Sequence, residues 1–219
     1  MAEPILVAGT DGRLTYRYRP ARPGVRLTVV LLHGLTGDER VMWVLERALP
    51  VGSRIVAPRA PFPAAEGGYG WLPFGTTGWP AREDFRDGVE ALGSLLDDLE
   101  HAGGLDRSRL VYLGFSQGAA LAFAASVLPR TRPAGLVALA GFLPAGDAAG
   151  LAGLSIFWGH GTSDERVPIA RARQDADRLR AAQARVILCE SDVGHKLGAE
   201  CLRGLRAWVG ETFPGLSES

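Results

Sequence analysis

The stretch Leu110-Val-Tyr-Leu-Gly-Phe-Ser-Gln-Gly118 decides the fold, together with the small-residue segment 119–127 that follows it. Its first four residues form a short apolar run that is typical of a buried strand, and segment 119–127 has the composition of a helix. Gly114 and Gly118 lack the Cβ atoms that would obstruct a tight turn between strand and helix. The stretch therefore predicts a strand, a sharp turn and a helix, with the hydroxyl of Ser116 exposed. The alternative is that Ser116 only caps the helix.

Strand and helix patterns alternate on both sides of this turn. The expected strands are 27–32, 54–57, 110–113, 134–140, 155–158 and 185–188. The expected helices are 41–49, 81–101, 119–127, 169–183 and 197–213. Short continuous apolar strands indicate a sheet that is buried on both faces, and crossover helices joining parallel strands are the simplest packing. We predict one α/β domain over 1–219 with a core from about 27 to 213, a mostly parallel sheet flanked by helices, and no separate lid domain.

The composition is that of an ordinary globular protein. Of the 219 residues, 47% are hydrophobic and 22% charged, which excludes disorder throughout the chain. Lys plus Arg and Asp plus Glu each number 24, so no net charge attracts nucleic acid or anionic lipid. No apolar run reaches the ~18 residues of a membrane helix, and arginines interrupt the first 32 residues, where a secretory signal would lie. We expect a cytoplasmic protein with no nucleic-acid partner and no stable membrane insertion.

The cysteines give no sign of a metal site. Cys189 and Cys201 form no C-x-x-C pair and do not cluster with histidines at zinc-finger spacing. A disulfide between them is left open, but a reduced pair is expected in the cytoplasm.

A serine nucleophile needs a base, and the chain offers four histidines. His195 follows the last expected strand and precedes the last helix, so it fits the chain order serine, acid, histidine. His33 is expected to brace an early loop by hydrogen bonds, and His101 to lie on the surface at a helix end. His160 directly follows a strand. We therefore predict His195 as the base.

The acid should lie between the nucleophile and the base. The aspartates in that interval are Asp147, Asp164, Asp175, Asp177 and Asp192. The pair at 175 and 177 belongs to a charged helix and is expected to be solvated. Asp164 comes just after the strand 155–158, and the carboxyl ends of parallel strands are where catalytic groups gather. We choose Asp164, with Asp192 as the reserve.

An oxyanion hole needs two backbone amides aimed at one point. The Gln117 amide, directly after the nucleophile, is one candidate, and the Leu35 amide in the glycine-containing loop 33–38 is the other. Segment 58–80 is rich in proline, glycine and aromatic residues, so we expect a long loop folded over the domain. The predicted apolar cleft wall consists of Phe62, Trp71, Phe74 and Trp79, with Leu35 and Leu143. The alternative is that these aromatics only plug the edge of the core.

Six short motifs in order resemble the phospholipase/carboxylesterase family, small α/β-hydrolases that include carboxylesterase II and the acyl-protein thioesterases. They are Leu32-His-Gly-Leu-Thr-Gly-Asp-Glu39, Pro58-Arg-Ala-Pro61, Gly114-Phe-Ser-Gln-Gly118, Gly141-Phe-Leu-Pro144, His160-Gly-Thr-Ser-Asp164 through Val167-Pro168, and Gly194-His195. The resemblance covers roughly 27–209 and implies Ser116, Asp164 and His195 as the triad, with the Leu35 and Gln117 amides as the oxyanion hole.

Two departures from the family pattern concern the acyl or leaving-group preference. Thr36 stands where the family commonly has glycine, and Gly70-Trp71-Leu72-Pro73 lacks the aspartate of the family's Gly-x-Trp-Phe-Asp stretch.

Taken together, these residues and motifs predict a serine carboxylesterase that hydrolyses short- to medium-chain esters through an acyl-enzyme, without metal or cofactor. A thioesterase acting on acyl-protein or acyl-CoA, or a lysophospholipase, would use the same triad. A non-catalytic binding protein on the same fold is the remote alternative. The expected partner is a small ester substrate, and a homodimer is left open.

Overall fold

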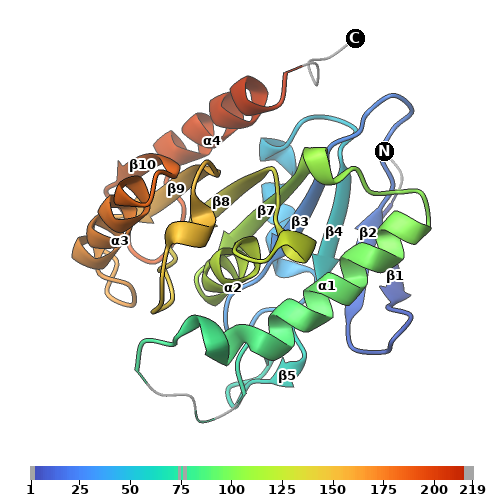
Figure 1. The fold of residues 1–219 in the computed structure, drawn as a ribbon, viewed down its shortest axis with the longest axis horizontal. Coiled ribbons are helices and arrows are strands. Elements are labelled where there is room, and N and C mark those ends of the chain that lie inside the picture. The colour runs from blue at the N-terminus through green and yellow to red at the C-terminus, as the bar shows by residue number, and fades with distance from the viewer. Residues whose placement is uncertain (1–2, 74, 76–77, 215–219) are drawn as a thin grey trace.

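An eight-stranded sheet forms the centre of the computed structural model, which describes residues 3–73, 75 and 78–214 (Figure 1). Its strand order is β1-β2-β4-β3-β7-β8-β9-β10. The strands are β1 Ile5–Ala8, β2 Thr15–Arg19, β3 Thr28–Leu32, β4 Arg54–Pro58, β7 Leu110–Phe115, β8 Gly135–Leu139, β9 Ser155–Gly161 and β10 Arg185–Ser191. Neighbours from β4 to β10 pair in parallel, and β1 and β2 add antiparallel pairs at one edge. The predicted mostly parallel sheet is confirmed.

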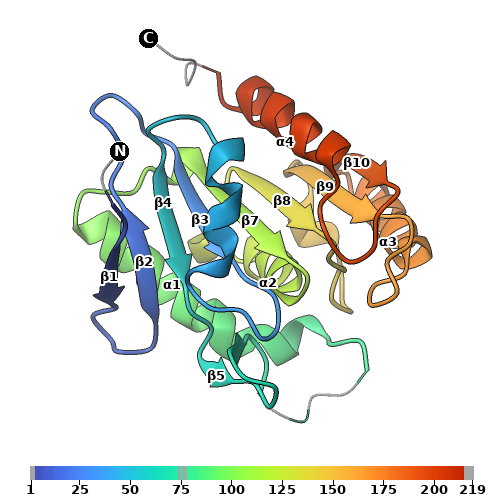
Figure 2. The ribbon, with the colours of Figure 1, turned by 180° about the vertical axis from the view of Figure 1, so that it is seen from behind.

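Helices cover both faces of this sheet. The α-helices are α1 Arg86–His101, α2 Gln117–Ser126, α3 Ile169–Ala181 and α4 Ala199–Thr212, and the 3₁₀ helices are η1 Val41–Ala48, η2 Arg82–Phe85, η3 Arg107–Arg109, η4 Pro129–Thr131 and η5 Ala149–Leu151. Helices α1, α2 and α3 lie on one face, while η1 and α4 cover the other (Figures 1 and 2). Alternate side chains of β3 serve the two layers: Val30 packs with the first and Val29 with the second. The predicted flanking helices are therefore confirmed.

The sheet starts earlier in the chain than the core predicted from residue 27. Strands β1 and β2 were not anticipated, yet Leu14 is 3% and Tyr16 8% exposed within the core. Arginines at alternate positions of β2 give it the polar composition of an edge segment, although Arg19 is itself buried and pairs with Glu46 of η1. Polar alternation of this kind hides a strand from a search for apolar runs.

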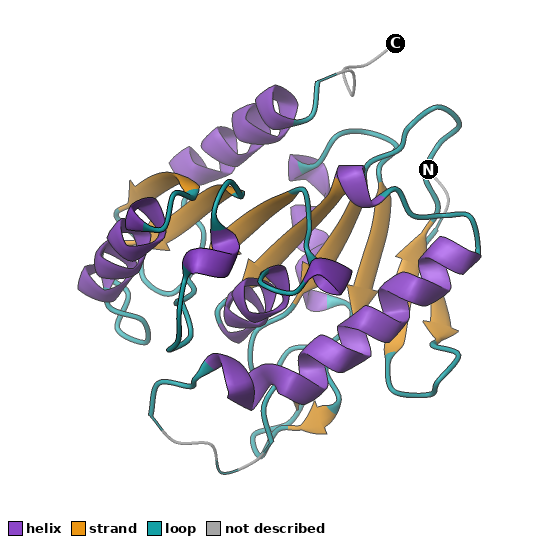
Figure 3. Cartoon of the chain, in the orientation of Figure 1, coloured by secondary structure: helices purple, strands orange, loops and turns teal. Residues whose placement is uncertain are grey.

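The described residues between β4 and η2 are almost entirely loop, as predicted (Figure 3). Their regular structure is one short antiparallel pair, β5 Phe62–Pro63 with β6 Tyr69–Gly70. The Tyr69 amide donates to the Gly37 carbonyl at 2.9 Å, and the Trp71 amide donates to Oε1 of Gln117 at 2.8 Å. The loop is therefore fastened to the carboxyl-terminal edge of β3 and β7.

The two cysteines are joined, so the expectation of a reduced pair is wrong for this structure. Cys189 on β10 and Cys201 on α4 form a disulfide, with Cα atoms 5.6 Å apart. The pairing arises because the last helix packs back on the last strand, a contact between elements that spacing alone does not reveal. The bridge closes a ring that contains His195.

Opening this ring should destabilise the protein. A disulfide across a separation of 12 residues restricts the unfolded chain, so we expect reduction to lower the free energy of unfolding by about 3 kcal/mol. The measurement is urea unfolding of the Cys189→Ser/Cys201→Ser variant beside oxidised and reduced wild type. Equal midpoints for the oxidised and reduced wild-type protein would show that the bridge contributes nothing.

Candidate active site

Ser116 stands at the sharp turn between β7 and α2. Its φ of 52° and ψ of −117° are an unfavourable combination for a residue with a side chain, and such strain is typical of functional sites. The Ser116 amide donates to the Leu139 carbonyl at 2.8 Å. A Cβ on Gly114 would lie 2.5 Å from the Gly118 carbonyl oxygen, and one on Gly118 would lie 2.2 Å from that of Leu32. The two glycines are therefore required where the turn meets neighbouring backbone.

The side chains of Ser116, His195 and Asp164 form one hydrogen-bonded line. Oγ of Ser116 lies 3.0 Å from Nε2 of His195, and Nδ1 of His195 lies 2.8 Å from Oδ2 of Asp164. They come from the carboxyl ends of β7, β10 and β9, which lie in one half of the sheet in the order β7-β8-β9-β10. The structure thus brings together the three side chains that the sequence selected.

Asp164 is held ionised by its surroundings. Its Oδ1 accepts hydrogen bonds from the Arg166 and Val167 amides, each at 2.9 Å. Burial by itself would raise the pKa of Asp164, but these bonds and the His195 ring outweigh burial and hold that pKa below its usual value. A carboxylate in this position fixes His195 with its proton on Nδ1, which leaves Nε2 free to accept the serine proton.

The backbone segments that carry Asp164 and His195 lie against each other. A Cβ on Gly161, the last residue of β9, would lie 2.2 Å from the Gly194 carbonyl oxygen. The segments carrying the acid and the base are therefore in direct backbone contact. The reserve acid, Asp192, instead places Oδ1 3.3 Å from the Ser163 hydroxyl.

Asp175 is buried, so the prediction of a solvated position is wrong. Its carboxylate accepts from the Leu143 amide at 3.0 Å, from Arg171 at 2.7 Å and from Arg178 at 3.1 Å. The expectation failed because arginines three and four residues away on α3 satisfy the charge and allow its burial. The network fixes the backbone that follows β8. Asp177 is exposed, as expected.

His33 braces the loop after β3, which confirms its predicted role. Its Nε2 accepts from the Ala60 amide at 2.9 Å, so the proton on Nδ1 donates to the Gly34 carbonyl at 2.7 Å. Burial lowers the pKa of His33, consistent with this neutral form. His160 is likewise a buried structural residue, with Nε2 2.8 Å from the Val167 carbonyl.

The loop after β3 presents the Leu35 amide beside the N-terminus of α2. Within the described part of the chain, neither the Leu35 amide nor the Gln117 amide donates a hydrogen bond. Free amides at a helix N-terminus stabilise negative charge. Thr36, where the family commonly has glycine, has a φ of 67°, a conformation costly for a β-branched residue. The departure seen in the sequence therefore adds strain directly beside the candidate oxyanion amide.

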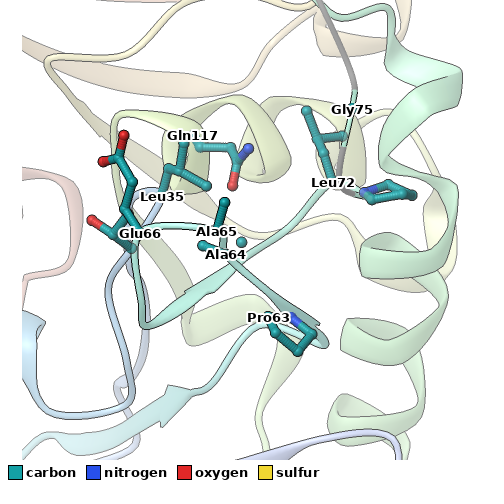
Figure 4. Close-up of a pocket in the computed structure, with 11 residues that line it drawn as sticks. Leu35, Pro63, Ala64, Ala65, Glu66, Leu72, Gly75 and Gln117 are labelled. Atoms are coloured by element: carbon teal, nitrogen blue, oxygen red, sulfur yellow. The ribbon is translucent and has the colours of Figure 1, made fainter.

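A hollow of about 200 Å³ lies between this loop and the aromatic segment (Figure 4). Leu35, Gln117, Pro63, Leu72 and Glu66 are among its lining residues, and in Figure 4 the side chains of Leu35 and Gln117 lie close together. Of the predicted wall residues that the structure describes, only Leu35 lines this hollow. Pro63 and Leu72 lie next to predicted residues in sequence, but no pattern distinguished them.

The other predicted wall residues are placed elsewhere. Trp71 is completely buried and donates its indole N–H to the His33 carbonyl, which makes it a support for the loop. Trp79 is 45% exposed and packs against Phe142 and the Arg171 guanidinium. The predicted wall also includes Leu143, whose side chain is buried, and Phe62, which lies half-buried on β5; neither lines the hollow. The remaining prediction, Phe74, lies outside the described residues.

No three His, Cys, Asp or Glu side chains among the described residues are grouped so that they could hold a metal ion. Nor does any helix in the described ranges have the length and apolar character needed to cross a membrane.

Comparison with known proteins gives the class to which this geometry belongs. The carboxylesterase of Mesorhizobium loti superposes with a TM-score of 0.83 at 22% identity, covering 95% of this chain and 99% of that chain. The Bacillus cereus carboxylesterase superposes with a TM-score of 0.82 at 21% identity, covering 93% of this chain and 97% of that chain. These likenesses show the fold, that of the α/β-hydrolases.

The sequence comparisons are more specific. The model of the Phospholipase/Carboxylesterase family matches residues 20–209, so the chain belongs to that family. Acyl-protein thioesterase 1 of Yarrowia lipolytica is 30% identical over 174 residues, 73% of this chain and 73% of that protein. Acyl-protein thioesterase 1 of Debaryomyces hansenii is 31% identical over 181 residues, which are 72% of this chain and 77% of that protein. The protein is thus a serine-type ester hydrolase of the carboxylesterase and thioesterase kind.

Proposed function

We propose that this protein is a serine carboxylesterase acting on short- to medium-chain carboxylic esters. The observation that carries the proposal is the line of hydrogen bonds from Ser116 through His195 to Asp164, at 3.0 and 2.8 Å. A serine, a base in contact with it and an acid orienting that base are the parts that nucleophilic acyl transfer requires.

The proposed reaction has two acyl-transfer steps. Oγ of Ser116 attacks the ester carbonyl while Nε2 of His195 takes its proton, and the oxyanion accepts hydrogen bonds from the Leu35 and Gln117 amides. The intermediate collapses as His195 gives that proton to the leaving alkoxide, which releases the alcohol and leaves an acyl-serine. Water, deprotonated by His195, then attacks the acyl-serine, and His195 returns that proton to Oγ of Ser116 as the carboxylic acid is released. Asp164 stays ionised throughout and stabilises the imidazolium.

The hollow beside Leu35 and Gln117 is the proposed acyl site. Leu72, Pro63 and Leu35 give it an apolar lining next to the candidate oxyanion amides. Its volume of about 200 Å³ supports an acyl chain of short to medium length.

A thioesterase is the second candidate, because the two fungal relatives are acyl-protein thioesterases. The triad serves an ester or a thioester equally well, so the choice lies with the leaving group.

Matched substrates test both candidates. We expect kcat/KM for p-nitrophenyl esters from acetate to palmitate to peak at short to medium chains and to fall by about tenfold or more at palmitate, whose tail exceeds the hollow. The best acyl group is then compared as oxygen ester and thioester of one leaving group. A rate maximum at palmitate would contradict the acyl site, and a strong preference for the thioester would favour the second candidate.

For location we propose the cytoplasm, and for partners a small ester substrate, with no nucleic acid. The Cys189–Cys201 bridge favours an oxidising compartment instead, because disulfides persist mainly in such compartments. Alkylation of free thiols in intact cells tests the location: a bridged pair there would contradict a reducing cytoplasm. The open alternative of a homodimer is tested by measuring the mass in solution.

A further inference from the structure

A second, larger hollow lies on the other side of the Leu35–Thr36 loop, between η1 and α4. It encloses about 560 Å³, and its walls are mainly apolar, with Val41, Val44 and Leu202 among them. Val44 is 79% exposed, so apolar surface here faces water. Figure 2 shows η1 and α4 on this face of the sheet, with η1 over β3 and α4 along the end formed by β9 and β10. We call this hollow the η1–α4 groove.

Three cations line the η1–α4 groove: Arg47 of η1, Lys196 directly after the candidate base, and Arg206 of α4. Among the described residues, no aspartate or glutamate belongs to the lining. Considering all described residues, none of the three cations forms an ion pair. The Arg206 guanidinium instead donates to the Arg47 carbonyl at 2.8 Å, which holds it at the groove between η1 and α4.

Many other arginines of this protein do form ion pairs. Arg107, for example, pairs with both Asp97 and Glu100, and Arg59 pairs with the buried Glu39. Positive charge beside apolar walls, without an acidic partner from the protein, suits a ligand that brings both an apolar group and an anion.

The groove lies beside the reacting groups. Leu35 and Thr36 line both hollows, and a Cβ on Gly34, another groove residue, would lie 3.4 Å from Cβ of Ser116. The ring of Phe115, which also lines the groove, lies 5.0 Å from the His195 ring. The groove thus adjoins the His195 side of the site.

The chemistry assigns the two hollows to the two halves of an ester. His195 must deliver its proton to the leaving oxygen, so the leaving group departs on the side of the His195 ring. The hollow that contains Gln117 lies beside the oxyanion amides and takes the acyl group. The η1–α4 groove, walled by the two residues that follow His195 in sequence, is left for the alcohol.

We propose that the η1–α4 groove binds the leaving-group half of the substrate, and that this half is an apolar alcohol or phenol carrying a negative charge. The inference rests on the proposed acyl transfer at Ser116 and adds its substrate class, esters of anionic alcohols. Lys196 and Arg206 hold the anion, and the apolar walls bury the carbon frame that joins it to the ester oxygen.

Two phenyl acetates test this directly: 4-carboxyphenyl acetate, whose leaving phenol is anionic, and its neutral methyl ester, 4-(methoxycarbonyl)phenyl acetate. The measured quantity is the ratio of their kcat/KM values, which is compared among variants, so that the intrinsic reactivity difference of the pair cancels. Arg206→Gln and Lys196→Gln should each lower the anionic-to-neutral ratio by about two- to fivefold, the size expected of an exposed ion pair. Added salt should lower the wild-type ratio too.

Arg203→Gln is the matched control. Arg203 lies one turn before Arg206 on α4, is exposed and does not line the groove, and its replacement removes the same charge. The ratio should be unchanged in this variant. Thermal unfolding of each variant checks that the protein is folded.

The outcomes separate the inference from the proposed function. If wild type hydrolyses both acetates but Arg206→Gln and Lys196→Gln leave the ratio unchanged, the inference is overturned and the esterase proposal stands. The inference is also overturned if Arg203→Gln lowers the ratio as much, because the effect is then one of general charge. If wild type hydrolyses neither acetate, the proposed function itself fails.

Discussion

Replacing Ser116 with alanine should lower kcat for ester hydrolysis by roughly 10⁴- to 10⁶-fold, the range seen when the nucleophile of a serine triad is removed. The mutation deletes the one oxygen that lies 3.0 Å from Nε2 of His195, so no acyl-enzyme can form. The oxyanion amides and the acyl hollow remain, and they account for a small residual rate. Burst kinetics with p-nitrophenyl acetate measure the loss of the acyl-enzyme directly.

The fold should be retained in this variant, because alanine meets the same backbone strain at φ 52° as serine does. Ser94→Ala, in the middle of α1 and far in sequence from the site, is the control and should keep full activity and full labelling by a fluorophosphonate. Wild-type rates in Ser116→Ala would refute the assigned nucleophile, and loss of labelling in Ser94→Ala would refute its selectivity.

Replacing Gly118 with alanine should abolish the fold or destabilise it by roughly 4 kcal/mol or more, a loss that only severe steric conflict in a core produces. The new Cβ would lie 2.2 Å from the Leu32 carbonyl oxygen and 2.5 Å from that of His33. Both atoms belong to the backbone at the end of β3. This strand is held between β4 and β7 in the sheet, so its backbone cannot move away from the new Cβ. The urea midpoint, followed by tryptophan fluorescence, measures the effect.

Gly210→Ala is the matched control, since a Cβ there meets no atom within 4 Å and the position is exposed on α4. It should gain about 0.5–1 kcal/mol from the higher helix propensity of alanine. An unchanged midpoint in Gly118→Ala would mean that α2 can move away from β3, and the close approach would then not be a requirement of the fold.

The turn at Ser116 was predictable because its cause is local. Gly114 and Gly118 act on backbone within a few residues of the serine or directly beneath it, and the apolar run before them has the length of a strand. The order of nucleophile, acid and base along the chain then selected Asp164 and His195. The positions of both, at the ends of neighbouring strands, follow from parallel topology.

What could not be predicted depends on contacts between distant elements. The bridge between Cys189 and Cys201 exists because α4 returns along β10, and β2 is a strand because β4 offers it an edge. Asp175 looks like a surface residue until Arg171 and Arg178 are seen to neutralise it. Sequence patterns report polarity, but the partner that makes a polar residue buriable is a property of the folded chain.

The disulfide has a further consequence, because Lys196 is the only lysine in the chain and is exposed within the ring that the bridge closes. A lysine-specific protease therefore has one backbone bond to cut, and that bond directly follows the residue after His195. The cut chain stays in one piece while the bridge is intact and separates into two fragments only when a reductant is added. A single nick can thus release one end of the His195 segment without removing any atom of the candidate triad.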